Sequence, residues 1–254
     1  MGNETEIKLW VKDAKALRPR LRELGARPLR GGVFGRTGRV HEWNVLFDTP
    51  GEDLRKRLQI LRIRTERRDQ GDSKETGRAG NARFASVGGR ERHLLTFKRP
   101  VRGVPDVPVN GAGRRRHKVR EEIEMEIADA AALTKVLEGL GMGAWFRYEK
   151  FRTTFQLPVT KRWASGLLIE LDETPIGTFV ELEGPPAAID RAARELGFTA
   201  RDYLVSSYLS LYREHCQRRG KRPGDMIFVP EKAITKIRKY IPYSVGTSIY
   251  SSSF

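Results

Sequence analysis

The chain has 254 residues, 39% of them hydrophobic, which suits one large domain or two small ones with a substantial core. Lysine and arginine number 48 against 32 aspartate and glutamate, so the formal net charge is +16 and anionic ligands are favoured. A single cysteine, Cys216, excludes an internal disulfide framework, and four histidines make a structural zinc site unexpected.

The N-terminal residues are polar, and no stretch reaches the ~20 consecutive apolar residues that cross a bilayer. We therefore expect a cytoplasmic protein without a signal peptide or a membrane partner. Specific binding of nucleic acid is not expected either, because the sequence shows no helix-turn-helix pattern and no strand rich in aromatic residues.

The spacing of apolar residues predicts strands separated by short helices. The first strand spans about 4–11, and Asp13 is expected to cap the helix that follows. Three helices are expected to end at a Leu-Gly pair, at residues 24–25, 140–141 and 196–197. The remaining strands are expected at about 33–49, 60–64, 93–98, 119–127, 144–156, 167–172 and 179–183, and the remaining helices at about 53–58, 129–141, 185–197 and 201–216.

Two segments interrupt this pattern. Residues 65–92 and 99–118 are rich in charge with Gly or Pro, and we interpret them as long flexible connections. The chain after residue 216 is first basic and then, from Ile241, without charge. We expect one domain over 1–216 and a disordered or loosely docked tail over 217–254.

Charged side chains alternate with other residues in the first strand. Glu4, Glu6 and Lys8 share one face, whereas Thr5 and Ile7 share the other. One such strand is typical of an ordinary solvated face, but the alternation recurs, which suggests a sheet whose charged faces converge. The recurring positions are Arg62, Arg64, Arg120, Glu122, Glu124, Glu126, Lys150, Arg152, Glu170, Asp172, Glu181 and Glu183.

The order of elements predicts an α+β fold with a mainly antiparallel sheet. Strands with one polar and one apolar face fit a barrel with a charged interior and helices packed outside. The alternative is that the charged faces are the exterior of an antiparallel sandwich.

The two kinds of charge favour different parts of one ligand. Arginine and lysine bind phosphate oxygens, and clustered carboxylates bind hard cations such as Mg²⁺ or Mn²⁺. A metal–polyphosphate complex needs both, and water could attack its phosphorus while the metal and the cations neutralise developing charge.

The motif Glu4-x-Glu6-x-Lys8 resembles the N-terminal signature of the CYTH superfamily, the triphosphate tunnel metalloenzymes. This superfamily includes class IV adenylate cyclases, thiamine triphosphatases and inorganic triphosphatases. Similar stretches follow in the same order as in the family, and together they cover residues 4 to about 213. They are Leu61-Arg62-Ile63-Arg64, Leu95-Thr96-Phe97-Lys98, Arg120-Glu121-Glu122-Ile123-Glu124, Glu149-Lys150-Phe151-Arg152, Ile169-Glu170-Leu171-Asp172 and Val180-Glu181-Leu182-Glu183.

The resemblance implies an eight-stranded antiparallel tunnel that holds a small-molecule triphosphate together with Mg²⁺ or Mn²⁺. It implies that Lys150 orients or deprotonates the attacking water, with a plain phosphate contact as the alternative. Glu122 and Glu124 join neither set, because one of them can instead pair with Arg120. The implied phosphate-binding residues are Lys8, Arg62, Arg64, Lys98, Arg120, Lys150 and Arg152, and the implied metal ligands are Glu4, Glu6, Glu170, Asp172, Glu181 and Glu183.

The leading hypothesis is metal-dependent hydrolysis of inorganic triphosphate or of a small organic triphosphate. One alternative is a class IV-type adenylate cyclase that converts ATP to cyclic AMP and pyrophosphate. Another is a polyphosphate-binding module without catalysis, against which the complete acidic strands argue. The expected assembly is a monomer or a homodimer.

Several other residues are not expected to carry chemistry. The four histidines share no metal-like spacing, and Asp48 is interpreted as a turn residue before Pro50. A helical stripe is expected to pack on the sheet through Tyr203, Leu204, Tyr208, Leu211 and Tyr212.

Overall fold

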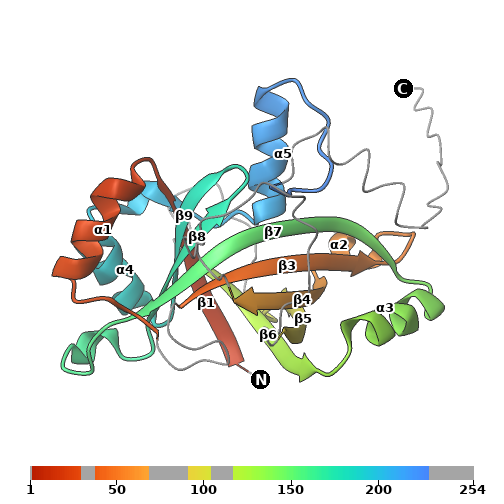
Figure 1. Cartoon of the computed structure of the whole chain (residues 1–254), viewed down its shortest axis with the longest axis horizontal. Coiled ribbons are helices and arrows are strands. Elements are labelled where there is room, and N and C mark those ends of the chain that lie inside the picture. Colours follow the sequence, from red (N-terminus) through yellow and green to blue (C-terminus); the bar gives the residue numbers. More distant parts are fainter. Residues whose placement is uncertain (1, 30–37, 69–90, 104–116, 229–254) are drawn as a thin grey trace, which may run out of the picture.

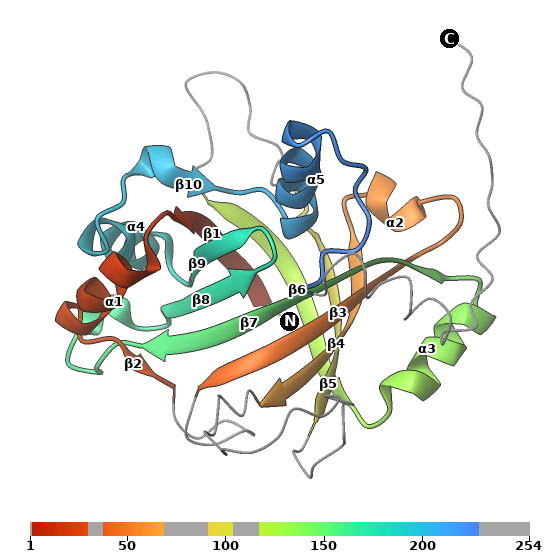
Figure 2. The ribbon, with the colours of Figure 1, turned by 45° about the horizontal axis from the view of Figure 1, so that its top comes forward.

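The computed structural model describes residues 2–29, 38–68, 91–103 and 117–228. Eight antiparallel strands close into a barrel, in the order β1-β6-β5-β4-β3-β7-β8-β9 and back to β1, which confirms the predicted fold class (Figures 1 and 2). The strands are β1 (Gly2–Val11), β3 (Arg39–Asp48), β4 (Ile60–Arg68), β5 (Arg92–Pro100), β6 (Lys118–Ile127), β7 (Gly143–Gln156), β8 (Leu168–Thr174) and β9 (Gly177–Glu183).

Two short strands extend this barrel. The strand β2 (Arg27–Pro28) pairs with β7, and β10 (Tyr203–Leu204) pairs with β1. The helices lie outside the barrel (Figure 1). They are α1 (Ala14–Glu23), α2 (Asp53–Lys56), α3 (Ala130–Gly139), α4 (Pro186–Glu195) and α5 (Tyr208–Arg218).

The apolar core lies between the barrel wall and the helices, because side chains alternate between the two faces of each strand. In β1, Ile7 and Leu9 are fully buried against a cluster that includes Leu17 and Leu21 of α1. Glu6 and Lys8, one residue away, face the barrel interior, where they line a cavity. One strand therefore supplies both the core and the charged interior.

The helix termini follow the sequence signals. The Asp13 carboxylate accepts the backbone N–H groups of Lys15 at 2.8 Å and Ala16 at 3.2 Å, which caps α1. Asp48 accepts three backbone N–H groups around the turn into α2, as expected of a turn residue. The three Leu-Gly ends are confirmed, with glycine φ angles of +76°, +82° and +83° at Gly25, Gly141 and Gly197.

The two predicted connections, 65–92 and 99–118, are longer than the segments that separate the strands in the structure. Strand β4 continues to Arg68 and β5 to Pro100, and β6 already begins at Lys118. These charged residues are in strands because their backbones pair with neighbouring strands, although the segments contain few apolar residues. The central parts of both predicted connections, 69–90 and 104–116, lie outside the described residues.

The predicted helix over 201–216 is wrong in its first turns. Residues Tyr203 and Leu204 form β10 instead, because they pair with Leu9 and Lys8 of β1. A capping box at Thr199 and a 3-10 turn over Ala200–Asp202 precede this strand. The helix α5 begins only at Tyr208, so the expected stripe loses its first two members.

The chain beyond α5 packs along the outside of β7. Met226 is fully buried, its N–H donates to the Arg147 carbonyl at 2.9 Å, and its own carbonyl accepts the Glu149 N–H at 3.0 Å. Residues 229–254, most of the predicted tail, lie outside the described part. Within the described residues, no helix has the length and apolar content to cross a membrane.

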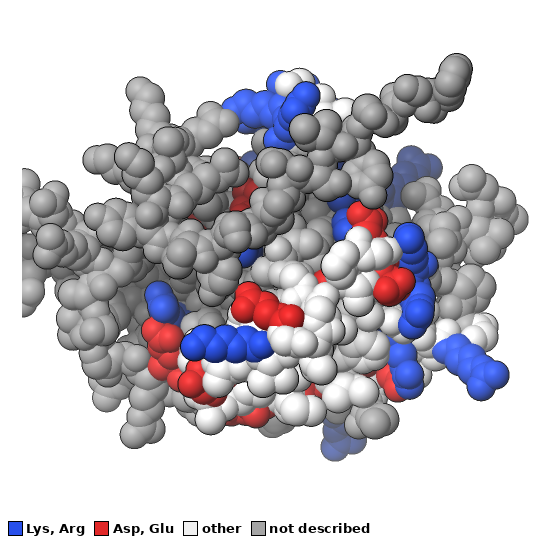
Figure 3. All heavy atoms as spheres, turned by 90° about the vertical axis from the view of Figure 1, so that its right-hand side faces the viewer, with Lys and Arg blue, Asp and Glu red and all other residues white. Residues whose placement is uncertain are grey.

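Figure 3 shows one outer face of the molecule, on which acidic and basic side chains of the described residues are interspersed with uncharged ones.

Candidate active site in the barrel interior

The barrel encloses a cavity of about 1010 Å³ to which all eight barrel strands contribute residues. Strand alternation directs every second side chain inward, which is why residues far apart in the sequence meet here. Among the described residues, ten lysines and arginines and seven glutamates line the cavity. The positive surplus favours an anionic ligand.

The structure brings nearly all of the predicted site residues together. Asp172 does not line the cavity itself, but it is fully buried in contact with Lys150 and Arg152, which do. The roles of these residues remain predictions. Those that line the cavity are Glu4, Glu6, Lys8, Arg62, Arg64, Lys98, Arg120, Glu122, Glu124, Lys150, Arg152, Glu170, Glu181 and Glu183.

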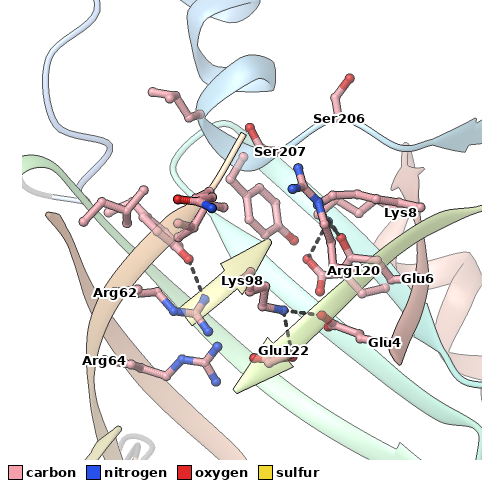
Figure 4. A pocket seen from close by; sticks show the side chains of 18 of the residues that line it. Glu4, Glu6, Lys8, Arg62, Arg64, Lys98, Arg120, Glu122, Ser206 and Ser207 are labelled. Carbon is pink, nitrogen blue, oxygen red and sulfur yellow. Dashed lines mark hydrogen bonds and ion pairs between the residues drawn. The ribbon is translucent and has the colours of Figure 1, made fainter. Parts of the chain in front are cut away.

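Lys98 of β5 lies between two carboxylates. Its ammonium group contacts Glu4 at 2.5 Å and Glu122 at 3.0 Å, and Arg62 and Arg64 point into the same space (Figure 4). Glu122 is therefore paired with Lys98, opposite it in the register of β5 and β6. A phosphate group entering here would compete with carboxylates for this lysine.

Glu6 is held by two lysines. Its Oε1 atom lies 3.1 Å from Lys8 Nζ and 2.8 Å from Lys118 Nζ. Burial alone would raise the pKa of Glu6, but Lys118 and Lys8 hold it well below the ordinary value. Lys118 was assigned to a connection in the sequence analysis, although its spacing from Arg120 and Glu122 continues the same inward alternation.

Asp172 of β8 links β7, which carries the predicted catalytic residue Lys150, to the helix α5. It accepts hydrogen bonds from Lys150 Nζ, from the Arg152 guanidinium and from the Tyr208 hydroxyl of α5, each at 2.7 Å. A metal ion would have to compete with all these donors for Asp172. Burial raises the pKa of Tyr208, as does the neighbouring Asp172 carboxylate, so the hydroxyl stays protonated as a donor.

Glu42 of β3 is a site residue that the sequence analysis missed. Its carboxylate is 1% exposed and lies 3.6 Å from nitrogen atoms of Arg64, Lys150 and Arg152. Burial opposes ionisation, yet these three cations hold the pKa of Glu42 well below the ordinary value. We refer to Glu42, Lys150, Arg152 and Asp172 as the paired cluster.

Arg62 and Arg120 each donate to a neutral oxygen, and Arg62 also lies 3.8 Å from the Glu124 carboxylate. The Arg62 guanidinium donates to the Tyr148 hydroxyl at 3.0 Å and to Thr96 Oγ1 at 3.1 Å. The Arg120 guanidinium donates to the backbone carbonyl of Leu58, in the turn between α2 and β4. Arg120 thus fixes that turn against the barrel wall.

Four carboxylates share a region of the cavity, and we call them the acidic cluster: Glu4, Glu122, Glu170 and Glu183. Lys98 contacts both Glu4 and Glu122, and the Arg152 guanidinium contacts Glu170. Burial and the charges of Glu4 and Glu170 raise the pKa of Glu183 to about 8. Burial raises the pKa of Glu170 to about 7, with Asp172 and Glu181 acting in the same direction against Arg152. As the described side chains stand, no three acidic or histidine groups form a ready metal site.

The sequence matches the profile of the CYTH domain over residues 2–208. The chain belongs to the CYTH family. A search of curated proteins finds no significant match.

Solved structures share the CYTH barrel at low identity. A protein from Pyrococcus horikoshii OT3 matches with a TM-score of 0.57 and 23% identity, over 84% of this chain and 99% of the other. A protein from Vibrio parahaemolyticus, described as a candidate adenylate cyclase, matches with a TM-score of 0.54 and 16% identity, over 82% and 96%. A conserved protein from Pyrococcus furiosus matches with a TM-score of 0.52 and 21% identity, over 82% and 99%. These likenesses show the fold.

Proposed function

We propose that this CYTH protein hydrolyses a triphosphate inside the barrel with the help of a divalent cation. The observation that supports the proposal is the convergence of cations from five strands on one open cavity of about 1010 Å³. Charges buried only for stability would be packed against one another, since a buried ion pair rarely stabilises a fold better than apolar packing. Here they surround space for a ligand.

The phosphate groups would be bound by the inward lysines and arginines. Arg62 suits this role because it donates to two neutral hydroxyl groups, and an anionic oxygen would replace these bonds with a stronger, charge-assisted one. Its contact with the Glu124 carboxylate, at 3.8 Å, is longer than a hydrogen bond. Lys150 would orient the attacking water or contact a phosphate oxygen. The full proposed set is Lys8, Arg62, Arg64, Lys98, Arg120, Lys150 and Arg152, to which the structure adds Lys118.

Mg²⁺ or Mn²⁺ fits the chemistry of the acidic cluster. Burial and neighbouring carboxylates raise the pKa values of Glu170 and Glu183, although Arg152 contacts Glu170. Carboxylate oxygens are the ligands that both ions prefer. Glu4, Glu170 and Glu183 would hold the ion, with Glu6, Glu181 and Asp172 as further predicted ligands. When bound, the ion supplies positive charge against that developing on the phosphoryl oxygens.

The test follows the products released from inorganic triphosphate, thiamine triphosphate and ATP, with Mg²⁺, with Mn²⁺ and with chelator. We expect metal-dependent release of phosphate, lowered by about 10²- to 10⁴-fold in Lys150→Gln if Lys150 acts on the water. In Glu4→Gln, the metal-dependent release of phosphate should be lost. A matched control is Glu173→Gln, on the outer face of β8, which should keep wild-type rates.

The same assay separates the alternatives. Release of pyrophosphate and cyclic AMP from ATP would make the protein an adenylate cyclase, the activity in the description of the Vibrio parahaemolyticus structure. Tight binding of triphosphate without turnover under either metal would leave a polyphosphate-binding module.

A further inference from the structure

One edge of β7 extends beyond the strand that pairs with it. In the described part of the chain, β8 pairs with residues 151–155 of β7, whereas β3 pairs along the other edge. Strand geometry directs the backbone groups of every second residue to the same side, so those of Arg147 and Glu149 point to the edge that β8 has left. Lys150, whose side chain points into the cavity, follows directly after this stretch. An unpaired edge here would leave Lys150 on a mobile part of the strand.

The chain after α5 covers this edge. Figure 2 shows it running from the end of α5 to β7. The Arg147 N–H donates to Asp225 Oδ1 at 2.8 Å, and the Arg147 carbonyl accepts the Met226 N–H at 2.9 Å. The Glu149 N–H donates to the Met226 carbonyl at 3.0 Å, and the Glu149 carboxylate accepts the Phe228 N–H. Met226 therefore continues the sheet in parallel to β7, where β8 no longer reaches.

The Met226 side chain is linked to the same lysine by a second route. It is fully buried in an apolar cluster that includes Tyr148 of β7 and Tyr208 of α5. The Tyr208 hydroxyl donates to Asp172 at 2.7 Å, and Asp172 accepts a second hydrogen bond from Lys150 Nζ, also at 2.7 Å. The Lys150 ammonium group lies 5.2 Å from the centre of the Tyr208 ring, a distance at which the ring face attracts a cation. Both the backbone of β7 and the Tyr208 side chain thus connect Met226 to Lys150.

We infer that Met226 is a positioning residue for Lys150, although it does not itself line the cavity. The inference rests on the proposed function, because it takes Lys150 to act on the attacking water or on a phosphate oxygen. Displacement of such a group by about 1 Å can lower a rate by about 100-fold. The match to the CYTH profile ends at residue 208, so Met226 belongs to a part of the chain that the family assignment does not cover.

The effect should be specific to Lys150. The next inward residue of β7, Arg152, lies in the stretch that β8 holds, opposite Asp172 in the register. Lys98 lies on β5, which β4 and β3 separate from β7 along the barrel wall. Loss of the Met226 pairing should therefore displace Lys150 and leave the other two cations in place.

The test uses Met226→Pro in the full chain, because proline lacks the N–H that donates to Arg147. The rate is measured in Mg²⁺ with whichever of inorganic triphosphate, thiamine triphosphate and ATP the wild type hydrolyses fastest. We expect kcat to fall by about 10- to 100-fold. The conservative variant Met226→Leu keeps the backbone donor and a side chain of similar volume, and it should restore most of the rate.

A double-mutant cycle separates positioning from a general loss of structure. In the Lys150→Gln background, Met226→Pro should lower the rate by less than about twofold further, because the group that it positions is already absent. In the Lys98→Gln background, Met226→Pro should cause the same proportional loss as in the wild type. A merely structural role would give equal losses in all three backgrounds.

Hydrogen exchange reports the edge directly, without substrate. The N–H groups of Arg147 and Glu149 should exchange faster in Met226→Pro than in the wild type, because their partners are displaced. If Met226→Pro does not fold, Asp225→Ala supports the same comparison. It removes the acceptor of the Arg147 N–H, keeps Met226, and should change the rate in the same direction by a smaller factor.

The possible outcomes distinguish the two proposals. Equal losses in the wild-type and Lys150→Gln backgrounds would overturn the role of Met226 and leave the proposed function standing. Faster exchange at Arg147 and Glu149 with an unchanged rate would do the same. A wild type that releases no phosphate from any of the three substrates overturns the proposed function and the inference with it, since Lys150 then has no reaction to serve.

Discussion

The paired cluster and the acidic cluster lie in the same barrel wall but differ in how their charge is balanced. In the paired cluster, Asp172 and Glu42 each contact both Lys150 and Arg152. In the acidic cluster, burial and neighbouring carboxylates raise the pKa of Glu183 to about 8. The carboxylates of the paired cluster contact two cations each, whereas Glu4 and Glu122 share Lys98, and Glu170 shares Arg152 with the paired cluster. Under the proposed function, the paired cluster would hold Lys150 and Arg152 in place and the acidic cluster would receive the metal.

The largest expected effect on stability comes from the paired cluster. Asp172→Asn removes the carboxylate charge shared by Lys150, Arg152 and Tyr208. Among the described residues, the buried Lys150 would keep only the 3.6 Å ion pair with Glu42, which should lower the free energy of unfolding by about 3 kcal/mol. Urea denaturation measures this change. The matched control Glu124→Gln changes a carboxylate that is 34% exposed and should cost less than about 1 kcal/mol. Equal losses in the two variants would contradict the assignment of the paired cluster.

Glu183→Gln should raise the stability of the folded protein, unlike Asp172→Asn, and the size of this effect should depend on pH. A carboxyl group whose pKa is raised on folding keeps a proton that the unfolded chain releases. Its contribution is therefore present below the ordinary pKa of 4.5 and is lost as the pH rises to about 8. In chelator, the variant should gain stability relative to the wild type across this range.

Chemical denaturation at pH 5 and at pH 9 measures the effect of Glu183→Gln. A difference from the wild type that does not change between the two pH values would show that the Glu183 carboxyl ionises normally in the folded protein.

A smaller effect is expected from metal binding. A divalent cation bound only by the folded acidic cluster should stabilise the protein by about 1.4 kcal/mol at ten times its dissociation constant, which corresponds to a melting-temperature rise of roughly 3–6 °C. Glu183→Gln should reduce this rise, and Glu124→Gln should keep it. If both variants respond to Mg²⁺ like the wild type, the metal binds outside the acidic cluster.

The strand alternation and the helix signals are local, and for this reason the sequence predicted them well. Alternating charges in β1 predicted its inward face, Asp13 and the Leu-Gly pairs predicted where helices begin and end, and Asp48 was predicted as a turn residue. Backbone geometry fixes these features over a few residues, whatever the rest of the chain does. Most of the candidate site could therefore be named by position, and the resemblance of the ordered motifs supplied the closed barrel.

The sequence could not predict which charged side chains of the cavity contact one another. Glu42 stands alone in its stretch of sequence, and only barrel closure places it beside Arg64, Lys150 and Arg152. The sequence analysis assigned Lys118 to a connection, and only the pairing of β6 with β1 shows that Lys118 belongs to a strand. The pKa of a buried group depends on neighbours from several strands and on the exclusion of water, which sequence spacing does not specify.

The sequence by itself determined that charged faces alternate with apolar ones, because strand alternation is a short-range pattern. Its ordered motifs carried the resemblance to the CYTH family, and the resemblance implied the barrel. Only the tertiary structure decided which charges neutralise one another and which carboxylates remain unbalanced. It also placed Leu58, at a positive φ, in the cavity wall with its carbonyl on Arg120. These features depend on contacts between residues far apart in the chain, and those contacts form only when the barrel closes.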